Sequence, residues 1–216
     1  MEIVYQDERI VVAVKPAGVL STDEAGGMPE LLRQALHTDC IRTVHRLDAQ
    51  TGGLMVFARS RMAAALLSEQ VRQRQFGKAY LAAVHGVPQP LSGEMRDLLE
   101  RDSVRRVTYV AQAPSAATRE ALLTYETIGS AEGLSLVRVQ LHTGRTHQIR
   151  VQFSSRGLPL WGDRKYGLPE DAAAASLGLW AYRLSFVHPQ SGKEMCFTCP
   201  PPEAEPWVRF EGAAEL

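Results

Sequence analysis

Seven short apolar runs, rich in β-branched residues, restrict the fold of this chain more than any other feature of its sequence. They have the length and composition of β-strands and lie at Ile10–Val14, Leu54–Ala58, Tyr80–Val84, Val107–Ala111, Ala121–Ile128, Leu134–Leu141 and Leu179–Val187. Helical patterns occur only at Pro29–His37, Ser60–Gln73 and Thr146–Arg156. Because strand mostly follows strand, the order favours an α+β fold with a largely antiparallel sheet over a regular βαβ repeat.

The length and composition predict one domain over residues 1–216. A chain of this length, with 45% hydrophobic and 22% charged residues, can bury a core of its own. No Gly/Ser-rich or Pro-rich linker divides it. The alanine-rich segment 168–177 is expected to be a surface excursion.

The N-terminal residues and the cysteines indicate a cytoplasmic protein. No apolar run approaches the roughly 18 residues that a membrane span needs, and Asp7, Glu8 and Arg9 interrupt the region where a signal peptide would be apolar. Three cysteines are too few for a disulfide framework. Two of them form a C-x-x-C at Cys196 and Cys199, which we interpret as ordinary cysteines because further ligands for a zinc ion are lacking nearby.

The formal net charge is zero, yet the positive charge is concentrated in two blocks. Residues 42–80 and residues 134–167 each carry a net charge of +5, and the remaining segments are acidic. If folding brings the two blocks together, they form a basic cleft that can follow a phosphate backbone. Two solvated helix faces are the simpler alternative.

The first group of candidate residues is His45-Arg46-Leu47-Asp48, directly before a Thr-Gly-Gly turn and a strongly apolar strand. In an extended segment, Arg46 and Asp48 point to one side and Leu47 to the other. A guanidinium and a carboxylate then share the mouth of a strand, where catalytic groups are often found. The alternative is that Asp48 is a turn residue that caps the backbone of residues 49–51.

The second group lies in LHTGRTHQIRVQF, where a turn at Thr143-Gly144 leads into the third predicted helix. Ile149 and Phe153 would face the core, and His147 and Arg150 the opposite side. A helix N-terminus that carries Arg145, Thr146 and His147 would suit a phosphate. A metal cluster of His45, His142 and His147 is a weaker alternative, because their spacing matches no standard ligand set.

Four segments in this order resemble the RluA-type pseudouridine synthases: HRLDAQTGGL, GKAYLAAVHG, TGRTHQIRVQFSSRGLPLWGDRKYG and FVHPQSGKE. The resemblance runs from AVKPAGVLS at Ala13–Ser21 to FTCPPP near the C-terminus. Each segment is moderately specific, and the ordered set is highly specific. The resemblance implies a mixed α/β catalytic domain whose central sheet is crossed by an active-site cleft, and an enzyme that isomerises uridine to pseudouridine in structured RNA.

The resemblance also implies roles for single residues. Asp48 matches the catalytic aspartate of the family, Tyr80 its active-site tyrosine and Arg150 the basic partner of the aspartate. Arg46 matches the arginine that enters the RNA when the target nucleotide leaves the stack. Three departures are visible: Gly53 where serine is frequent, Gln152 where histidine is frequent, and Trp180 in place of the common LHA pattern. They concern RNA preference more than the chemistry.

The chemistry explains why these residue types are needed. The N1–C1′ bond must break and a C5–C1′ bond must form without any redox change, so no cofactor is expected. A carboxylate beside C1′ can add to the sugar or stabilise positive charge there, and removal of the 2′ proton is an alternative first step. A guanidinium at Arg150 would keep that carboxylate ionised. Tyr80 would pack on the uracil, unless it is simply a core aromatic residue.

RNA contacts are expected from Arg46, Lys78, Arg145 and His147, which would offset the cost of flipping the target base. The catalytic motif begins by residue 45, which leaves no room before it for an S4-type RNA-binding module. Recognition is therefore expected to come from the catalytic domain itself, which favours a compact stem-loop of transfer or ribosomal RNA. Separately, we expect a monomer. Two other classes of protein stay open: an RNA-binding protein without catalysis, and a metal-dependent hydrolase built on the histidines.

Overall fold

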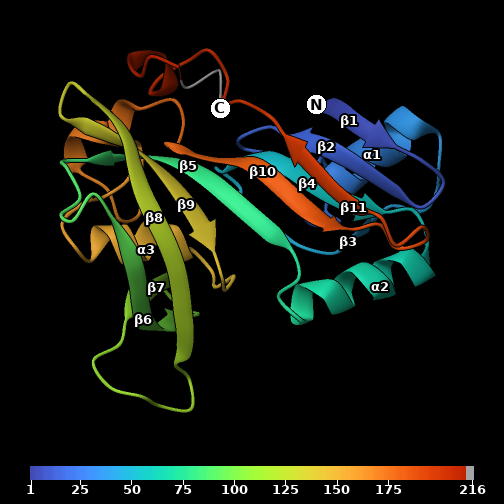
Figure 1. The fold of residues 1–216 in the computed structure, drawn as a ribbon, viewed down its shortest axis with the longest axis horizontal. Coiled ribbons are helices and arrows are strands. Elements are labelled where there is room, and N and C mark those ends of the chain that lie inside the picture. The colour runs from blue at the N-terminus through green and yellow to red at the C-terminus, as the bar shows by residue number, and fades with distance from the viewer. Residues whose placement is uncertain (213–216) are drawn as a thin grey trace. The chain divides into compact units, whose positions relative to one another are not determined.

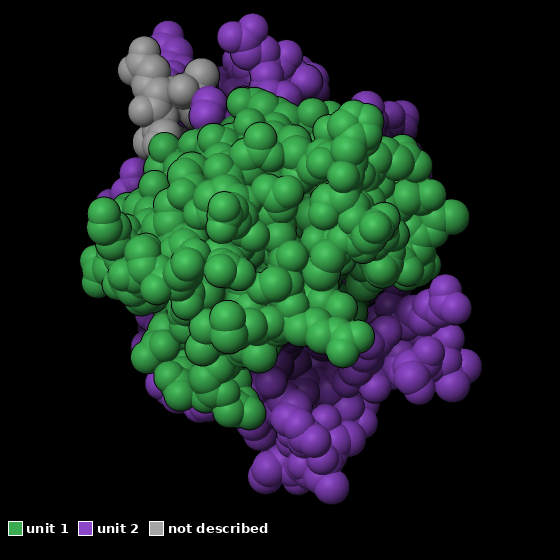
Figure 2. Space-filling model, turned by 90° about the vertical axis from the view of Figure 1, so that its right-hand side faces the viewer, with its two compact units in different colours: residues 1–78, 181–199 green, residues 79–180, 200–216 purple. Residues whose placement is uncertain are grey.

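A computed structural model describes residues 1–212 of the chain (Figure 1). The chain divides into two compact units, which Figure 2 shows in green and purple. Unit 1 comprises residues 1–78 and 181–199, and unit 2 comprises residues 79–180 and 200–216. Within residues 1–212, no helix is both long and apolar enough to span a membrane. A single catalytic domain over the whole chain stays a prediction.

Unit 1 is built on a largely antiparallel sheet with the strand order β1-β2-β4-β10. Two further strands pair with it, β3 with β4 and β11 with β10. The strands are β1 (Glu2–Gln6), β2 (Ile10–Lys15), β3 (Arg42–Thr43), β4 (Gly52–Ala58), β10 (Leu179–Val187) and β11 (Glu194–Thr198). Two helices complete the unit, α1 (Met28–Leu36) and α2 (Arg61–Arg72).

The core of unit 1 follows from the alternation of side chains along its strands. β2 and β4 pair antiparallel from Ile10 opposite Ala58 to Lys15 opposite Gly53, so residues of one parity share a face. Helix α2 packs on that face. The buried cluster there consists of Ile10, Val12, Leu54, Val56, Ala58, Ala63, Leu67, Phe76, Leu184 and Phe186. All seven residues of β4 are buried, which explains why this strand reads as one continuous apolar run.

Unit 2 contains a second group of strands in the order β5-β9-β8-β6-β7. They are β5 (Gly77–His85), β6 (Ser92–Asp102), β7 (Val107–Val110), β8 (Arg119–Ala131) and β9 (Leu134–Leu141). Helix α3 (Gln148–Ser154) packs against this group through Phe153, whose ring meets Tyr125 edge-on. Two 3-10 turns follow, η1 (Pro169–Ala173) and η2 (Trp207–Arg209).

The α+β fold with a largely antiparallel sheet is confirmed, and all seven predicted strands are present. Helices α1 and α2 also lie where they were predicted, and Ser60 caps α2 by accepting a hydrogen bond from the amide of Ala63. Four strands were not predicted: β1, β3, β6 and β11. Strand β6 was missed because GEMRDLLERD is dense in charges, and only its pairing with β7 and β8 makes it a strand.

The prediction for the third helix was wrong in two respects. The helix begins at Gln148 rather than Thr146, and His147 before it adopts a left-handed conformation with φ of 55°. Its predicted open side is also buried at Arg150, which is 6% exposed. The segment after residue 167 is a surface excursion in part, but it is anchored by Asp171, which contacts His85 and accepts the amide hydrogen of Gly162.

Candidate active site

In unit 1, the loop that carries Asp48 is fixed by a fully buried lysine. β2 ends at Lys15, whose side chain is 0% exposed. Its ammonium nitrogen donates to three carbonyl oxygens, those of Pro16 at 2.9 Å, Val19 at 2.6 Å and Ala49 at 2.9 Å. Ala49 directly follows Asp48, so Lys15 ties the end of β2 to the Asp48 loop.

The charge of Lys15 is sensitive to this environment. Burial lowers the pKa of Lys15 to about 8, and the negative charge of Asp48 opposes that shift. The negative charge of Asp48 therefore favours the charged form of the Lys15 ammonium. A buried ammonium beside the loop is costly unless its hydrogen bonds are satisfied, which the three carbonyls achieve.

The other side of the loop is fixed through Leu47. The Ser21 hydroxyl donates to the carbonyl oxygen of Leu47 at 2.9 Å and accepts the Leu47 amide hydrogen at 3.1 Å. The amide of Thr51 donates to the carbonyl oxygen of Asp48. Leu47 is buried, Arg46 is exposed and Asp48 is half-buried, as the predicted alternation requires. The residues on both sides of Asp48 are thus anchored in the core of unit 1.

His45 has a structural role in the same segment. It is buried, accepts the amide hydrogen of Val56 through Nε2 at 3.1 Å, and meets Phe76 edge-on. Burial, with a smaller contribution from the positive charge of Lys78, lowers the pKa of His45 to about 3, so its ring is neutral. Burial also lowers the pKa of Lys78 itself.

The histidines of the metal alternative have separate partners. Nε2 of His142 lies 3.2 Å from the Thr124 hydroxyl, and Nδ1 of His147 lies 2.7 Å from the Tyr166 hydroxyl. Across residues 1–212, no group of three or more His, Cys, Asp or Glu side chains is placed to hold a metal ion.

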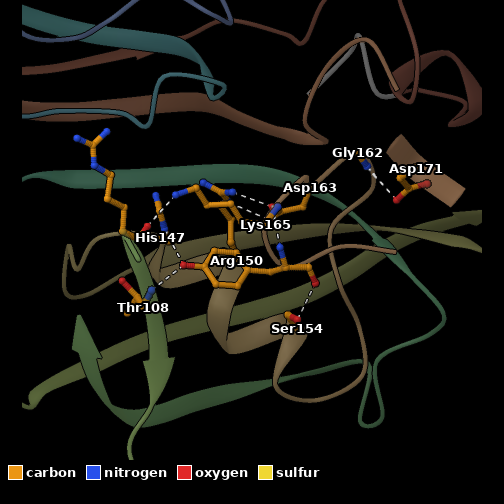
Figure 3. Close-up of polar contacts among 10 residues, drawn as sticks. Thr108, His147, Arg150, Ser154, Gly162, Asp163, Lys165 and Asp171 are labelled. Carbon is orange, nitrogen blue, oxygen red and sulfur yellow. Dashed lines mark hydrogen bonds and ion pairs between the residues drawn. The ribbon is translucent and has the colours of Figure 1, made fainter. Parts of the chain in front are cut away.

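In unit 2, Arg150 forms a buried two-pronged ion pair with Asp163 (Figure 3). Nε of Arg150 donates to Oδ2 and Nη2 to Oδ1, both at 2.7 Å. The side chains are 7% and 0% exposed. Burial alone would favour the protonated acid, but hydrogen bonds from Arg150 and from two backbone amides outweigh it and lower the pKa of Asp163. The pair is therefore charged at neutral pH.

The turn before α3 is organised by the Gln148 side chain. Its Oε1 accepts from the Thr143 hydroxyl at 2.8 Å and from the Arg145 amide at 3.0 Å, and its Nε2 donates to the Leu122 carbonyl. The Arg145 guanidinium donates to the carbonyl of Glu120. The helix begins at Gln148, so Arg145 and Thr146 lie before it, and the Gln148 side chain accepts the Arg145 amide hydrogen. Contact of Arg145 and His147 with RNA phosphates stays a prediction.

Two of the three departures from the family pattern have a structural reason. Gly53 has φ of +119°, and a Cβ there would lie 2.4 Å from the carbonyl oxygen of Ala181 and 2.6 Å from its nitrogen. A serine would collide with this backbone. Gln152 is fully buried and donates to the Met95 carbonyl and the Asp97 carboxylate, which joins α3 to β6.

The predicted site residues are divided between the units. Arg46, Asp48 and Lys78 belong to unit 1, and Tyr80, Arg145, His147 and Arg150 belong to unit 2. Tyr80 is buried on β5, with 6% of its surface exposed. The pairing of Asp48 with Arg150 stays a prediction.

Sequence reasoning assigned no role to Lys15, Asp163 or Tyr166. Lys15 stands at the end of an apolar strand, where a lysine that is followed by proline signals an unusual strand end. Asp163 and Tyr166 lie in GDRKYG, which is part of one of the segments that resemble the family. Two glycines around an aspartate and a tyrosine indicate a tight turn, and that signal could have pointed to both residues.

Comparison with known proteins identifies the family. The sequence profile described as RNA pseudouridylate synthase matches residues 9–155. An uncharacterized RNA pseudouridine synthase of Mycoplasma pneumoniae is 34% identical over 202 residues, which cover 91% of this chain and 65% of that protein. The ribosomal large subunit pseudouridine synthase D of Zymomonas mobilis is 35% identical over 223 residues, covering 94% of this chain and 70% of that protein.

The fold agrees with this assignment. The solved structure of human RNA pseudouridylate synthase domain containing 1 superposes with a TM-score of 0.82 over 94% of this chain and 84% of that one, at 24% identity. The chain spans slightly less than two thirds of the Mycoplasma relative. With a profile that covers most of its length and relatives above 30% identity, the chain belongs to the RNA pseudouridine synthase family of isomerases.

Proposed function

We propose that this chain converts uridine to pseudouridine in structured RNA, with Asp48 acting at C1′ of the target nucleotide. The observation that carries the proposal is the anchoring of the Asp48 loop. Buried Lys15 holds the carbonyl of Ala49, and buried Ser21 holds both backbone groups of Leu47. A carboxylate whose two neighbours are fixed in this way is preorganised, as a group that must meet one sugar carbon has to be.

The remaining roles are part of the proposal; those of Arg150, Tyr80 and Arg46 follow from the family resemblance, and those of Lys78, Arg145 and His147 from their charge and position. Arg150 would keep the Asp48 carboxylate ionised during the reaction, and Tyr80 would pack against the uracil. Arg46, which is exposed at the start of the Asp48 loop, would occupy the space that the flipped nucleotide leaves. Lys78, Arg145 and His147 would contact phosphate groups around the target.

Two first steps are compatible with these residues. Asp48 can add to C1′ as the N1–C1′ bond breaks, which gives an ester to the sugar and a free uracil anion. Alternatively, a base removes the 2′ proton, and uracil leaves as the sugar becomes unsaturated. In the first route, C5 of the rotated uracil displaces the Asp48 carboxylate from C1′; in the second, C5 adds to C1′ and the proton returns to C2′. In both routes the C5 proton is then lost to solvent and N1 takes up a proton.

We further propose that the substrate is a stem-loop of ribosomal or transfer RNA and that the chain acts as a monomer. The name of the Zymomonas relative places that protein's activity on the large ribosomal subunit. The net charge of +5 in residues 42–80 and again in residues 134–167 supports a polyanionic partner.

The test uses RNA labelled with tritium at uridine C5, since formation of pseudouridine releases this label. Wild-type protein is expected to release tritium from total RNA of cells that lack the gene, and Asp48→Asn is expected to release none above the protein-free level. Asp39→Asn, at an exposed aspartate of the same unit, serves as the matched control and should match wild type. Release by Asp48→Asn at the wild-type rate would refute the assignment of Asp48. RNA binding by wild type without any release would instead favour a non-catalytic RNA-binding protein.

A further inference from the structure

We propose that Asp163 and Tyr166 are positioning residues that hold the guanidinium of Arg150 in one orientation for catalysis. The inference rests on the proposed function, in which Arg150 serves the catalytic carboxylate. It adds two residues to which the sequence analysis assigned no role.

The first step of the argument is the geometry of the ion pair. Asp163 engages Arg150 through two different nitrogens, Nε and Nη2, at equal distances of 2.7 Å. Two parallel bonds to one carboxylate fix both the plane and the rotation of a guanidinium, which a single bond does not. Figure 3 shows the two side chains meeting in this way.

The second step concerns what holds Asp163 itself. Its Oδ1 also accepts the amide hydrogens of Lys165 at 2.9 Å and Tyr166 at 3.2 Å. The turn closes when the amide of Gly167 donates to the Asp163 carbonyl at 2.8 Å, and a Cβ at position 167 would lie only 2.2 Å from that oxygen. The carboxylate is therefore part of a tight turn that leaves it little freedom to move.

The third step is the tyrosine. The centre of the Tyr166 ring lies 5.2 Å from Cζ of Arg150, within the range of a cation–π contact. Its hydroxyl accepts the amide hydrogen of Thr108 at 2.8 Å and lies 2.7 Å from Nδ1 of His147. The ring is thus held against the guanidinium by partners on β7 and at the start of α3.

The same turn is also bound to the other end of α3. The Ser154 hydroxyl donates to the carbonyl of Tyr166 at 2.8 Å. His147 and Ser154 lie at opposite ends of the helix that carries Arg150. The turn, the helix and the guanidinium therefore form one rigid frame.

The energetics favour a role in orientation over a role in stability. Taking two charges out of water costs several kcal/mol per ion, and their mutual attraction often does no more than repay that cost. A well-packed apolar pair would stabilise the core equally well. An arginine whose charge is balanced by Asp163 offers a directed set of N–H donors instead of a loose cation, and that property is useful for chemistry at a fixed atom.

The test compares two buried aspartates of unit 2. Asp163→Asn removes the negative charge that holds Arg150. Asp171→Asn is the matched control, because Asp171 is 8% exposed, contacts His85 and accepts the Gly162 amide hydrogen, but does not bind Arg150. In the tritium-release assay, Asp163→Asn is expected to lower kcat about 100-fold with KM for the RNA within about threefold. Asp171→Asn should keep kcat within about threefold of wild type, even if its melting temperature falls as far as that of Asp163→Asn.

Two further variants keep the proposal testable if Asp163→Asn does not fold. Tyr166→Phe retains the ring and removes only the hydroxyl, and we expect a loss in kcat of about tenfold. In an Arg150→Lys background, Asp163→Asn should cost far less than it does in wild type, because lysine cannot form the two-pronged pair.

A spectroscopic readout tests the pairing without reference to activity. In ¹⁵N-labelled protein, the Nε–H of Arg150 should exchange slowly with solvent in wild type and in Asp171→Asn, and rapidly in Asp163→Asn. Wild-type kcat in Asp163→Asn or in Tyr166→Phe, or equal kcat losses in Asp163→Asn and Asp171→Asn, would overturn the inference and leave the proposed function intact. If wild type releases no tritium, the proposed function fails, while rapid exchange of this proton in wild type would separately refute the pairing.

Discussion

Replacing Lys15 by methionine probes how the Asp48 loop is held. Methionine keeps the length and the apolar stem of the side chain and removes the ammonium, so the carbonyls of Pro16, Val19 and Ala49 lose their shared donor. At about 2 kcal/mol for each buried acceptor, the loss is roughly 6 kcal/mol. Methionine avoids the cost of burying a charge. The fall in the pKa of Lys15 from 10.5 to about 8 corresponds to a cost of roughly 3 kcal/mol. We therefore expect Lys15→Met to lower the free energy of unfolding by about 3 kcal/mol at pH 7.

The same variant has a signature in the pH dependence of stability. Between about pH 8 and 10.5, Lys15 loses its proton in the folded protein but keeps it in the unfolded chain. The unfolded state then binds more protons, so the contribution of Lys15 to stability rises with pH. From pH 7 to 9.5 the increase is about 2 kcal/mol. Lys15→Met lacks this group, so the difference between wild type and variant should widen by that amount.

The assay is urea unfolding followed by circular dichroism at several pH values in this range, with tritium release measured on the same samples. Lys193→Met, at an exposed lysine of the same unit, is the control and should stay within about 0.5 kcal/mol of wild type. Because the carbonyl of Ala49 follows Asp48, Lys15→Met should also lower kcat. Unfolding free energies that differ by a constant amount from pH 7 to 9.5, or a variant as stable as wild type, would refute the reasoning.

Two further substitutions test the geometry around the candidate site. Gly53→Ser should destabilise unit 1 by about 3 kcal/mol or more, because its Cβ would meet the Ala181 backbone, whereas Gly133→Ser, with open space around it, should cost about 1 kcal/mol. Equal shifts of the two variants in thermal unfolding would contradict this account. Gln148→Leu should lower the free energy of unfolding, measured in urea, by about 3 kcal/mol. The reason is that the Arg145 amide, the Thr143 hydroxyl and the Leu122 carbonyl each lose a partner. An unchanged unfolding midpoint would show that the turn does not depend on this side chain.

The strands were predictable from sequence where their burial is strong and local. β4 and β9 stand out because most of their residues are apolar, whatever lies beside them. β6 could not be predicted in this way, because its charged residues pair across the sheet and its identity as a strand depends on β8. Arg96 on β6, for example, forms an ion pair with Glu120 on β8, a contact between residues far apart in the chain.

The candidate residues were also predictable where their signal is local in the sequence. Asp48 and Arg150 stand in short motifs that a reader can recognise. Lys15 and Asp163 act through partners distant in the chain, Ala49 for the first and Arg150 for the second, and no local pattern reveals those contacts. The start of α3 was misplaced because the Gln148 side chain supplies an acceptor that replaces the first helical turn.

Because unit 1 consists of two separate stretches of the chain, it cannot be completed early during synthesis on the ribosome. β10 lies beside β4, and β11 pairs with β10, so the sheet of unit 1 is completed by residues 181–199. A nascent chain that has emerged only as far as residue 178 still lacks these strands, and one edge of the wholly apolar β4 awaits its neighbour. Unit 1 is begun first but is completed only after residues 79–180 of unit 2 have been made, and during that interval its open edge is the part of the molecule that a chaperone would need to shield.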